Sequence, residues 1–331
     1  MKYSLSIIIP SYNSIKTIDR CLSSVFSSKF KNYEVIVVSD NSNDRSNDII
    51  KKYPCRLIKL KKNVGAAAAR NTGAKIAKSD ILIFLDSDVI IKKNALEIIN
   101  KNFKNKKINL IQGIYSHKPN YKKFTTQFLQ SHTCYYLFTE NKKFTESLCT
   151  CFVSIRRKLF LESKGFDENF YSSNSEDEDL GYRLIEKGYV IPIDRRLNAI
   201  HDIDISLFDF IKRSLKMHFG EMKLYLRKKK ITKKIEQGNN LPILLGIGLI
   251  FWILFLPIIN IFFNIPKFFE FFLILNLSFL FISFNFLKFI FVNKGLINTI
   301  VSVPLIYLNR FLMMICAVFA ILDFYLLGND Y

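Results

Sequence analysis

Two aspartates that follow a short apolar run are the residues best suited to chemistry. Asp86 and Asp88 come directly after Ile81 to Leu85 and are separated by one serine. Because oxygen ligands suit Mg²⁺ and Mn²⁺, the pair could hold a divalent cation, Asp88 directly and Asp86 through a ribose or a water molecule. Such an ion would neutralise the charge that develops on a leaving nucleoside diphosphate. A solvated turn is the alternative, and the buried approach through Phe84 and Leu85 disfavours it.

An alanine-rich segment, Asn63 to Gly73, precedes this pair and carries Arg70. Its small side chains favour a helix that packs closely, and the planar guanidinium of Arg70 could clasp a diphosphate through two parallel hydrogen bonds. His201 is a lone histidine that follows a strand-like run. It is placed to be a third metal ligand, and a surface histidine is the alternative.

Four consecutive acidic residues, Glu176, Asp177, Glu178 and Asp179, begin a helix that we predict over 177–186. Carboxylates at a helix N-terminus complement the helix dipole. Four together exceed that need and repel one another, so we expect at least one of them to serve chemistry.

Another carboxylate, Asp40, follows the apolar run Tyr33 to Val38. A carboxylate at this position could accept the imide N–H of a uracil, and Asp44 could hold the loop or a ribose. The sequence Asp-Asn-Ser is also a common turn, so a purely structural role stays open.

These polar residues follow strands of one predicted sheet. The apolar runs 5–10, 33–38, 56–60 and 81–85 alternate with helical segments, which is typical of a mostly parallel sheet with helices on both faces. In such sheets ligands bind at the carboxyl ends of the strands, where this chain keeps its polar residues. The glycine patterns of dinucleotide-binding and P-loop proteins are absent, which argues against dehydrogenases and P-loop enzymes.

The C-terminal quarter of the chain has a different composition, in which Phe, Leu and Ile dominate. The stretches 241–263 and 271–292 are each long enough to cross the hydrocarbon core of a bilayer, so they predict a transmembrane hairpin. A third stretch, about 300–327, is interrupted by a proline and two charged residues. The sequence leaves open whether it spans the membrane, lies at the interface, or does both in turn.

The formal net charge of +20 raises the question of nucleic-acid binding. Much of the positive charge is instead local, in a juxtamembrane segment that we place at 211–240. Basic residues beside a first span fix its orientation and attract anionic lipid headgroups, so we expect the membrane and not nucleic acid as the partner. The basic residues of this segment are Lys212, Arg213, Lys216, Lys223, Arg227, Lys228, Lys229, Lys230, Lys233 and Lys234.

The N-terminus has too short an apolar run for a signal peptide, and the cysteines are scattered without metal-ligand spacing. Both observations predict a globular part, residues 1–210, that stays in the cytoplasm with free thiols. The transmembrane region would then be 241–331, and the chain a multi-pass protein of the cell membrane.

Several segments, in their order and spacing, resemble glycosyltransferase family 2 over roughly residues 4 to 205. They are Ile-Ile-Ile-Pro-Ser-Tyr-Asn at 7–13, Val-Val-Ser-Asp-Asn-Ser-Asn-Asp at 37–44, Asn-Val-Gly-Ala-Ala-Ala-Ala-Arg-Asn-Thr-Gly at 63–73, Phe-Leu-Asp-Ser-Asp at 84–88, Gly-Phe-Asp-Glu at 165–168 and Glu-Asp-Glu-Asp-Leu-Gly-Tyr-Arg-Leu at 176–184. The resemblance implies an α/β GT-A fold, an inverting single-displacement reaction, a nucleotide diphosphate sugar as donor, and Mn²⁺ or Mg²⁺ as cofactor.

The resemblance also implies roles for individual residues. Pro10, Tyr12 and Asp40 would face the base, Arg70 and Asp86 the nucleotide, and Asp88 with His201 the metal and diphosphate. Asp177 would be the general base, and Glu176 would position the acceptor. Because Glu-Asp occurs twice in the acidic run, its register is ambiguous. We prefer the first pair, since Asp179-Leu180 then fits the trailing Asp-Leu of the family.

Departures from familiar subgroups narrow the reaction. No Gln-x-x-Arg-Trp follows His201, and the single tryptophan, Trp252, lies in the first span, so the sequence does not resemble a processive polysaccharide synthase. We expect transfer of one sugar, from a UDP-sugar, to a hydroxyl of a lipid-linked glycan during cell-surface polysaccharide assembly. Two alternatives stay open: a polyprenyl-phosphate sugar synthase, and a catalytically silent membrane protein that binds nucleotide sugars or lipids.

Acceptor binding has one candidate region. The stretch from Tyr115 to Phe144 is rich in aromatic residues and is predicted to be helical. It would form the acceptor side of the site, although aromatic stripes at helical spacing belong more often to a hydrophobic core.

Overall fold

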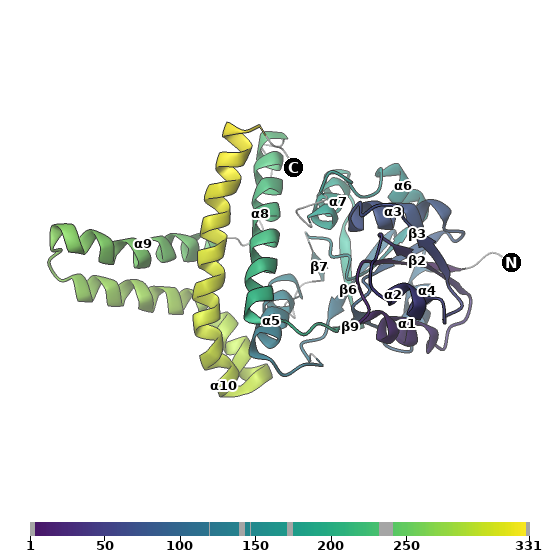
Figure 1. Ribbon diagram of the computed structural model, residues 1–331, viewed down its shortest axis with the longest axis horizontal. Coiled ribbons are helices and arrows are strands. Elements are labelled where there is room, and N and C mark those ends of the chain that lie inside the picture. Colours follow the sequence, from purple (N-terminus) through teal and green to yellow (C-terminus); the bar gives the residue numbers. More distant parts are fainter. Residues whose placement is uncertain are drawn as a thin grey trace. The chain divides into compact units, whose positions relative to one another are not determined.

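The structure is a computed structural model. It describes residues 4–118, 120–138, 143–145, 147–170, 175–231 and 241–328. Its contacts divide the chain into two units: Met1–Lys122 together with Tyr136–Asp204, and Lys123–Tyr135 together with Ile205–Tyr331. The first is an α/β unit and the second is helical (Figure 1).

Four parallel strands form one half of the sheet in the α/β unit. β1 (Leu5–Ser11) lies between β2 (Tyr33–Ser39) and β4 (Ile81–Leu85), and β3 (Arg56–Lys59) pairs with the other edge of β2. Every residue of β1 and β4 is buried, as in strands that helices cover on both faces. This half confirms the parallel sheet that the alternation of strands and helices predicts.

The other half of the sheet is mixed. β8 (Phe152–Arg156) runs antiparallel between β4 and β6 (Leu110–Tyr115), and β9 (Ile191–His201) runs parallel to β6. β5 (Val89–Ile90) and β7 (Phe144–Thr145) pair antiparallel with opposite ends of β9. The strand order is β3-β2-β1-β4-β8-β6-β9-β5.

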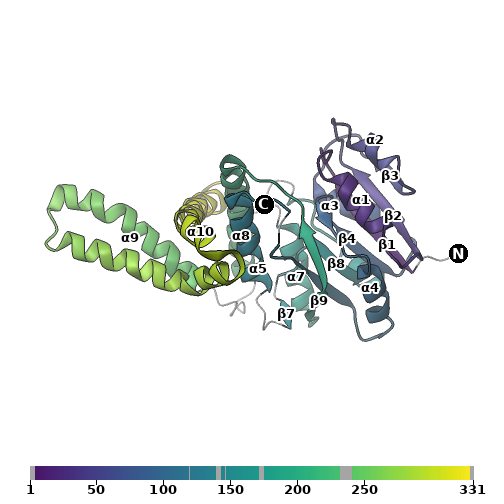
Figure 2. The ribbon, with the colours of Figure 1, turned by 90° about the horizontal axis from the view of Figure 1, so that it is seen from below.

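Helices cover both faces of this sheet, with α3 on one face and α1 and α4 on the other (Figures 1 and 2). In α1 the apolar residues Ile18, Cys21, Leu22 and Val25 are three or four positions apart and are all buried, so this helix presents one apolar face to the sheet. The helices of this unit are α1 (Ile18–Phe26), α2 (Ser46–Ile50), α3 (Ala66–Ile76), α4 (Ala95–Phe103), α6 (Arg157–Glu162) and α7 (Glu176–Glu186).

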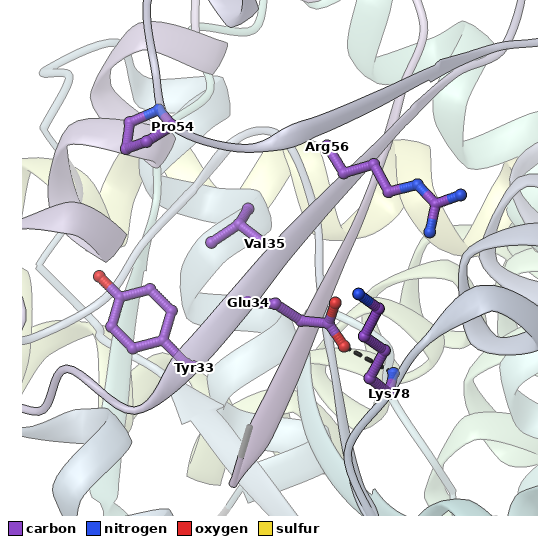
Figure 3. Close-up of a pocket in the computed structure, with 6 residues that line it drawn as sticks. All are labelled: Tyr33, Glu34, Val35, Pro54, Arg56 and Lys78. Atoms are coloured by element: carbon purple, nitrogen blue, oxygen red, sulfur yellow. Dashed lines mark hydrogen bonds between the residues drawn. The ribbon is translucent and has the colours of Figure 1, made fainter. Parts of the chain in front are cut away.

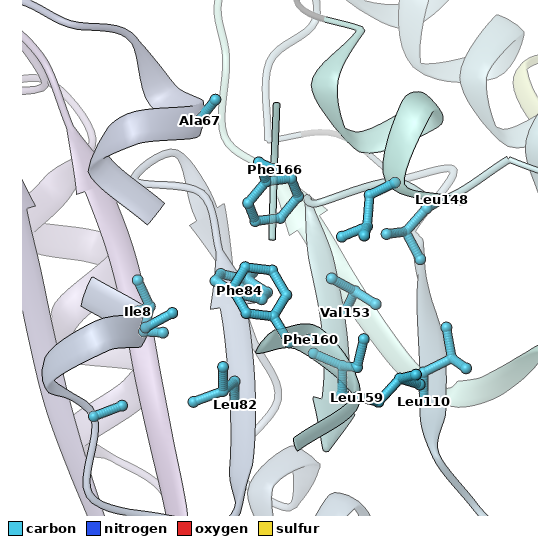
Figure 4. Close-up of a cluster of buried hydrophobic side chains, with 14 of the residues drawn as sticks. Ile8, Ala67, Leu82, Phe84, Leu110, Leu148, Val153, Leu159, Phe160 and Phe166 are labelled. Atoms are coloured by element: carbon cyan, nitrogen blue, oxygen red, sulfur yellow. The ribbon is translucent and has the colours of Figure 1, made fainter. Parts of the chain in front are cut away.

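The hydrophobic core beside β4 is built around Phe84 (Figure 4). Its ring centroid lies 4.9 Å from that of Phe160 and 5.0 Å from that of Phe166. On the β1 side, α3 approaches the sheet so closely that a Cβ added at Gly73 would lie 2.5 Å from Cγ2 of Ile8. The small residues of this segment therefore serve close helix–sheet packing.

The aromatic stretch at 115–144 is not one helix, so that prediction is wrong. Tyr115 ends β6 and Phe144 begins β7, and among the described residues of this stretch Phe124–Phe138 form helix α5. Phe128 of α5 is 2% exposed and packs within the helical unit against two other phenylalanine rings. At this position the aromatic stripe is core and not an acceptor surface.

Three helices make up most of the helical unit: α8 (Leu207–Ile231), α9 (Leu241–Phe263) and α10 (Phe268–Leu326). By length and composition alone, α9 and α10 could each cross a membrane. α9 has the bounds predicted for the first span, and α10 runs through both later apolar stretches. It bends at Gly295, whose φ of 80° favours glycine.

The division of the chain into 1–210, 211–240 and 241–331 stays a prediction. The structure divides at residue 204 and places Lys123–Tyr135 with the C-terminal helices. Part of the basic segment, with Lys233 and Lys234, lies outside the described residues.

Candidate active site

The end of β2 carries Asp40, which fastens the loop that leads into α3. Its Oδ1 accepts a hydrogen bond from the backbone N–H of Val64 and its Oδ2 one from that of Gly65, both at 2.8 Å. Gly65 has a φ of 90°, a conformation that other residues rarely adopt. Each carboxylate oxygen keeps a second lone pair, so the structure gives Asp40 a loop-holding role beside the base contact that we predict.

Arg70 lies on α3 beneath the end of β4 and is 4% exposed. One terminal nitrogen donates to Oδ1 of Asp86 at 2.6 Å and the other to Oε1 of Glu176 at 2.7 Å. Arg70 therefore links the end of β4 to the start of α7, and both terminal nitrogens already have carboxylate partners. The diphosphate clasp that we predict for this guanidinium stays a prediction.

The charge environment of Asp86 is set by its neighbours. Burial raises the pKa of the Asp86 carboxyl above its ordinary value, the Arg70 guanidinium opposes this, and the charge of Asp88 adds to the rise. A cation between or beside the carboxylates of Asp86 and Asp88 would reduce their mutual repulsion, so this pair favours cation binding.

Asp177 lies in the first turn of α7, half-buried, and receives two hydrogen bonds from Thr150. The backbone N–H of Thr150 donates to Oδ2 of Asp177 at 3.0 Å, and the Thr150 hydroxyl donates to the same oxygen at 3.2 Å. Burial, together with the charge of Glu176, raises the pKa of Asp177 to about 7, while the Thr150 N–H opposes the rise. A carboxylate poised near neutral pH suits general-base chemistry.

Asp179, the second aspartate of the acidic run, has a structural partner. Its Oδ2 accepts from Nε of Arg183 at 2.7 Å, one turn along α7. The same guanidinium donates to the backbone carbonyls of Ser163 and Gly165. Asp179 therefore has an ion-pair partner in its own helix, and this favours Asp177 over Asp179 as the reactive residue.

Asp88 and His201 lie side by side. Oδ2 of Asp88 is 3.3 Å from Nε2 of His201, because Val89 of β5 pairs with His201 at the end of β9. The imidazole stacks on the ring of Tyr115, with centroids 4.5 Å apart and planes within 8°. Among the described residues no three His, Cys, Asp or Glu side chains gather as a ligand set. Two protein ligands still fit Mg²⁺ or Mn²⁺, since these ions take further oxygens from phosphates and water.

The remaining predicted residues are Pro10, Tyr12 and Asp44. Pro10 is buried within β1, whereas Tyr12 just after it is 52% exposed. Asp44 accepts from the backbone N–H groups of Ile15 and Ser46, both at 3.0 Å, so it joins the loops after β1 and β2. Of the two roles that the sequence left open for Asp44, the structure provides the loop contact.

Sequence reasoning missed two residues of this region. One is Thr150, which holds Asp177. The other is Asp202, 1% exposed, whose carboxylate accepts from Arg20 and from Asn120, and whose backbone N–H donates to the carbonyl of Asp88 at 2.7 Å. Neither lies in a motif, and the position of Asp202 beside His201 was the available signal for it.

A shallow pocket of about 200 Å³ lies elsewhere, at the amino ends of β2 and β3 (Figure 3). It is lined by Tyr33, Glu34, Val35, Pro54, Arg56 and Lys78. Ligands of parallel sheets bind at the opposite, carboxyl ends. We therefore assign the chemistry to the strand ends that carry Asp40 and Asp86.

The strand order, the acidic residues at the strand ends and the buried Arg70 together define a GT-A type glycosyltransferase domain. Residues 6–163 match the model of glycosyl transferase family 2. The resemblance and the fold class that the sequence suggests are therefore confirmed, and so is its class as a glycosyltransferase.

Named relatives match part of the chain. The chain is 39% identical over 118 residues to the poly(ribitol-phosphate) β-N-acetylglucosaminyltransferase TarP of Staphylococcus aureus, covering 34% of this chain and 36% of TarP. It is 38% identical over 117 residues to WfgD of Escherichia coli, a UDP-Glc:α-D-GlcNAc-diphosphoundecaprenol β-1,3-glucosyltransferase, covering 34% of this chain and 46% of WfgD. The matches thus span about a third to a half of each relative.

Solved structures share the fold. The match to a crystal structure of S. aureus TarS, residues 1–349, covers 98% of this chain and 92% of the TarS chain, with a TM-score of 0.52 and 18% identity. A mannosyltransferase from Pyrobaculum calidifontis, in complex with GDP-Man and Mn²⁺, covers 98% and 87%, with a TM-score of 0.58 and 14% identity. At these identities the likeness is one of fold alone.

Proposed function

We propose that this chain is an inverting glycosyltransferase that moves one sugar from a nucleotide diphosphate sugar to a hydroxyl of a lipid-linked glycan. The observation that carries the proposal is Asp177, a carboxylate with a pKa of about 7 that Thr150 holds at 3.0 Å. An acceptor hydroxyl must lose a proton as it attacks, and a base with this pKa can take that proton near neutral pH. A phosphate acceptor would need no such base, so the hydroxyl acceptor is favoured.

In the proposed step the acceptor oxygen forms a bond to the anomeric carbon while the bond from that carbon to the diphosphate oxygen breaks. The electron pair of the broken bond leaves with the nucleoside diphosphate, and the hydroxyl proton passes to a free lone pair of the Asp177 carboxylate. Attack from the side opposite the leaving group inverts the anomeric configuration. Glu176, held by Arg70 next to Asp177, would position the acceptor.

The leaving diphosphate needs charge neutralisation, which a divalent cation supplies when it is bound. Asp88 and His201 are the residues that would hold Mn²⁺ or Mg²⁺, with Asp86 reaching it through ribose or water. Arg70 keeps Asp86 directed to this end of β4, since it donates to one oxygen and leaves the other available.

A UDP-sugar is the donor that we propose. Asp40 would accept the imide N–H of uracil on a free lone pair, with Pro10 and Tyr12 facing the base and Asp44 near the ribose. WfgD is named for UDP-Glc, and TarS has been solved with UDP-GlcNAc. The mannosyltransferase was solved with GDP-Man, so the base is a point to test.

The acceptor and the location are proposed together. WfgD is named for a diphosphoundecaprenol-linked sugar and TarP for poly(ribitol-phosphate), and these names support a lipid-linked or polymeric acceptor. The apolar helices α9 and α10 would anchor this chain in the cell membrane as a multi-pass protein. Exposed basic residues of α8, such as Lys212, Arg213 and Lys216, would keep the catalytic unit on the cytoplasmic side and bind anionic lipids.

The proposal is tested with the purified full chain in detergent or nanodiscs, a panel of nucleotide sugars, and Mn²⁺ or Mg²⁺. We expect release of a nucleoside diphosphate from one donor, abolished by a chelator and restored by added metal. Asp177→Asn should bind the same nucleotide and lose turnover. Wild-type protein that binds a nucleotide and never turns over, even with a lipid-linked acceptor, would contradict the proposal.

A further inference from the structure

We propose that α10 crosses the membrane only as far as Gly295, and that its remainder, residues 296–326, lies flat on the membrane surface together with α8. We call residues 296–326 the surface segment, and α9 with residues 268–294 the hairpin. This inference rests on the proposed membrane anchoring and specifies which helices span and which do not.

The bend at Gly295 separates two differently placed parts of one helix. Gly295 has φ 80° and ψ 178°, which is outside helical geometry. Within the helical unit, α9 and the first part of α10 project sideways from the pair formed by α8 and the surface segment, as both views show (Figures 1 and 2). If the hairpin crosses the bilayer, the pair lies along its surface.

Buried polar contacts tie the surface segment to α8. Nζ of Lys223, whose side chain is 2% exposed, lies 2.7 Å from Oδ2 of Asp323. Nε2 of His218 lies 3.0 Å from Oδ1 of Asn309. Asp323, which interrupts the third apolar stretch, and Asn309 therefore face α8 and are not directed toward lipid.

α8 itself is unsuited to cross a bilayer. Its described charged side chains are Asp209, Lys212, Arg213, Lys216, Glu221, Lys223 and Arg227. A charged side chain at the centre of a bilayer is energetically costly, and several of these side chains are exposed. Because the surface segment packs along α8, it cannot span unless α8 spans beside it.

The opposite face of the surface segment is apolar and exposed. Phe311, Val318, Leu322 and Tyr325 recur at helical spacing, and Val318 and Tyr325 are 54% and 68% exposed. The face turned to α8 carries Leu312, Cys316, Ala320 and Phe324, all buried. A helix that turns polar side chains such as Asp323 and Asn309 to a neighbouring helix and exposes an apolar face fits the boundary between headgroups and acyl chains.

Continuity identifies the occupant of this face as lipid. The surface segment belongs to the same helix as residues 268–294, so it leaves the bilayer at Gly295 with its apolar face at the membrane. The exposed cations of α8, including Lys212 and Lys216, suit the anionic headgroups of the same leaflet. Unlike α8, α9 carries no charge, and it exposes apolar side chains along its length.

The single tryptophan allows a direct test by depth-dependent fluorescence quenching. The full chain is reconstituted in vesicles of neutral and anionic phospholipid that carry a quencher either near the headgroup or near the acyl-chain end. Trp252 of α9 is the deep control. In a Trp252→Phe background, Phe311→Trp probes the middle of the surface segment and Leu322→Trp probes a point near its end.

A flat segment places both probes at one shallow depth, so we expect Phe311→Trp and Leu322→Trp to be quenched several-fold more by the headgroup quencher than by the deep one. A spanning segment would instead place position 311 deep and position 322 shallow, and that gradient would overturn the inference. Absence of quenching at both positions would also overturn it, because a second copy of the chain would then cover this face. If Trp252 itself is not quenched by the deep quencher, the proposed membrane anchoring is wrong, and the inference about the surface segment fails with it.

Discussion

At the scale of single residues, the proposed general base is defined by the pair Thr150 and Asp177. The Thr150 hydroxyl donates to Oδ2 of Asp177 at 3.2 Å and so favours the ionised carboxylate. In Thr150→Val this bond is lost while the backbone N–H remains. We expect the acid limb of the kcat profile to move to higher pH by about half a unit to one unit, with KM for the donor unchanged.

Two further variants give this prediction its control. Thr150→Ser should restore the wild-type limb, because it keeps the hydroxyl. Thr72→Val removes a hydroxyl that donates only to the carbonyl of Ala68 in its own helix, and it should leave the pH profile unchanged. A Thr150→Val limb identical to wild type would show that the hydroxyl does not act on Asp177.

The raised pKa of Asp177 also predicts a pH-dependent stability. The folded state holds this proton with a pKa of about 7, whereas an unfolded aspartate has a pKa of about 3.9. Stability from this group is therefore present below about pH 4 and is lost as the pH rises through 7. We expect Asp177→Asn to be more stable than wild type at about pH 8, on the order of 1 kcal/mol after allowance for partial solvent exposure, and not at about pH 4. Thermal unfolding at both pH values measures this, and an equal difference at the two would contradict it.

At the scale of elements, helix α7 carries both the aspartate that we propose as the general base, Asp177, and one with a structural partner, Asp179. Asp179→Asn weakens the contact with Arg183, which also holds the carbonyls of Ser163 and Gly165. We expect a loss of about 1–3 kcal/mol in stability, with a kcat profile of unchanged shape. Asp177→Asn should show the reverse pattern, so thermal unfolding and pH–rate profiles of the two variants decide the register. A large loss of kcat in folded Asp179→Asn would favour the second register.

The contact of α3 with β1 predicts a coupling between Gly73 and Ile8. A Cβ at Gly73 would lie 2.5 Å from Cγ2 of Ile8, so Gly73→Ala should destabilise the chain by about 1–3 kcal/mol. Ile8→Val shortens the other branch and loosens the site, so the double variant should lose less than the sum of the single ones. Strict additivity in thermal unfolding would contradict this packing.

Prediction from sequence succeeded where structure is local and failed where it is not. The strands β1 to β4 follow from apolar runs that alternate with helices, and Asp40 and Asp86 follow from their place at strand ends. The link from Arg70 to Glu176 joins residues 106 positions apart, and no periodicity reports such a contact. The position of antiparallel β8 beside β4 is also non-local, because the residues of β8 do not indicate which strands it pairs with.

At the scale of the whole molecule, composition separated an α/β unit from a helical unit that contains two helices apolar and long enough to cross a membrane. The net charge of +20 is partly concentrated before the first apolar helix, and the membrane partner that this distribution indicates stays a prediction. Periodicity could not decide how many times the chain crosses the membrane. That question depends on what Asp323 and Asn309 face, which only the packing of α8 on α10 reveals.

The measurement that tests the central claim most directly is the pH dependence of kcat for sugar transfer by the full chain, wild type beside Asp177→Asn, from about pH 5 to about pH 9. If Asp177 is the general base, the wild-type rate falls about tenfold per pH unit below about 7 and is level above it. Asp177→Asn then loses on the order of a hundredfold to ten-thousandfold in kcat and shows no acid limb. An Asp177→Asn enzyme within tenfold of wild type, with the same acid limb, would contradict the account.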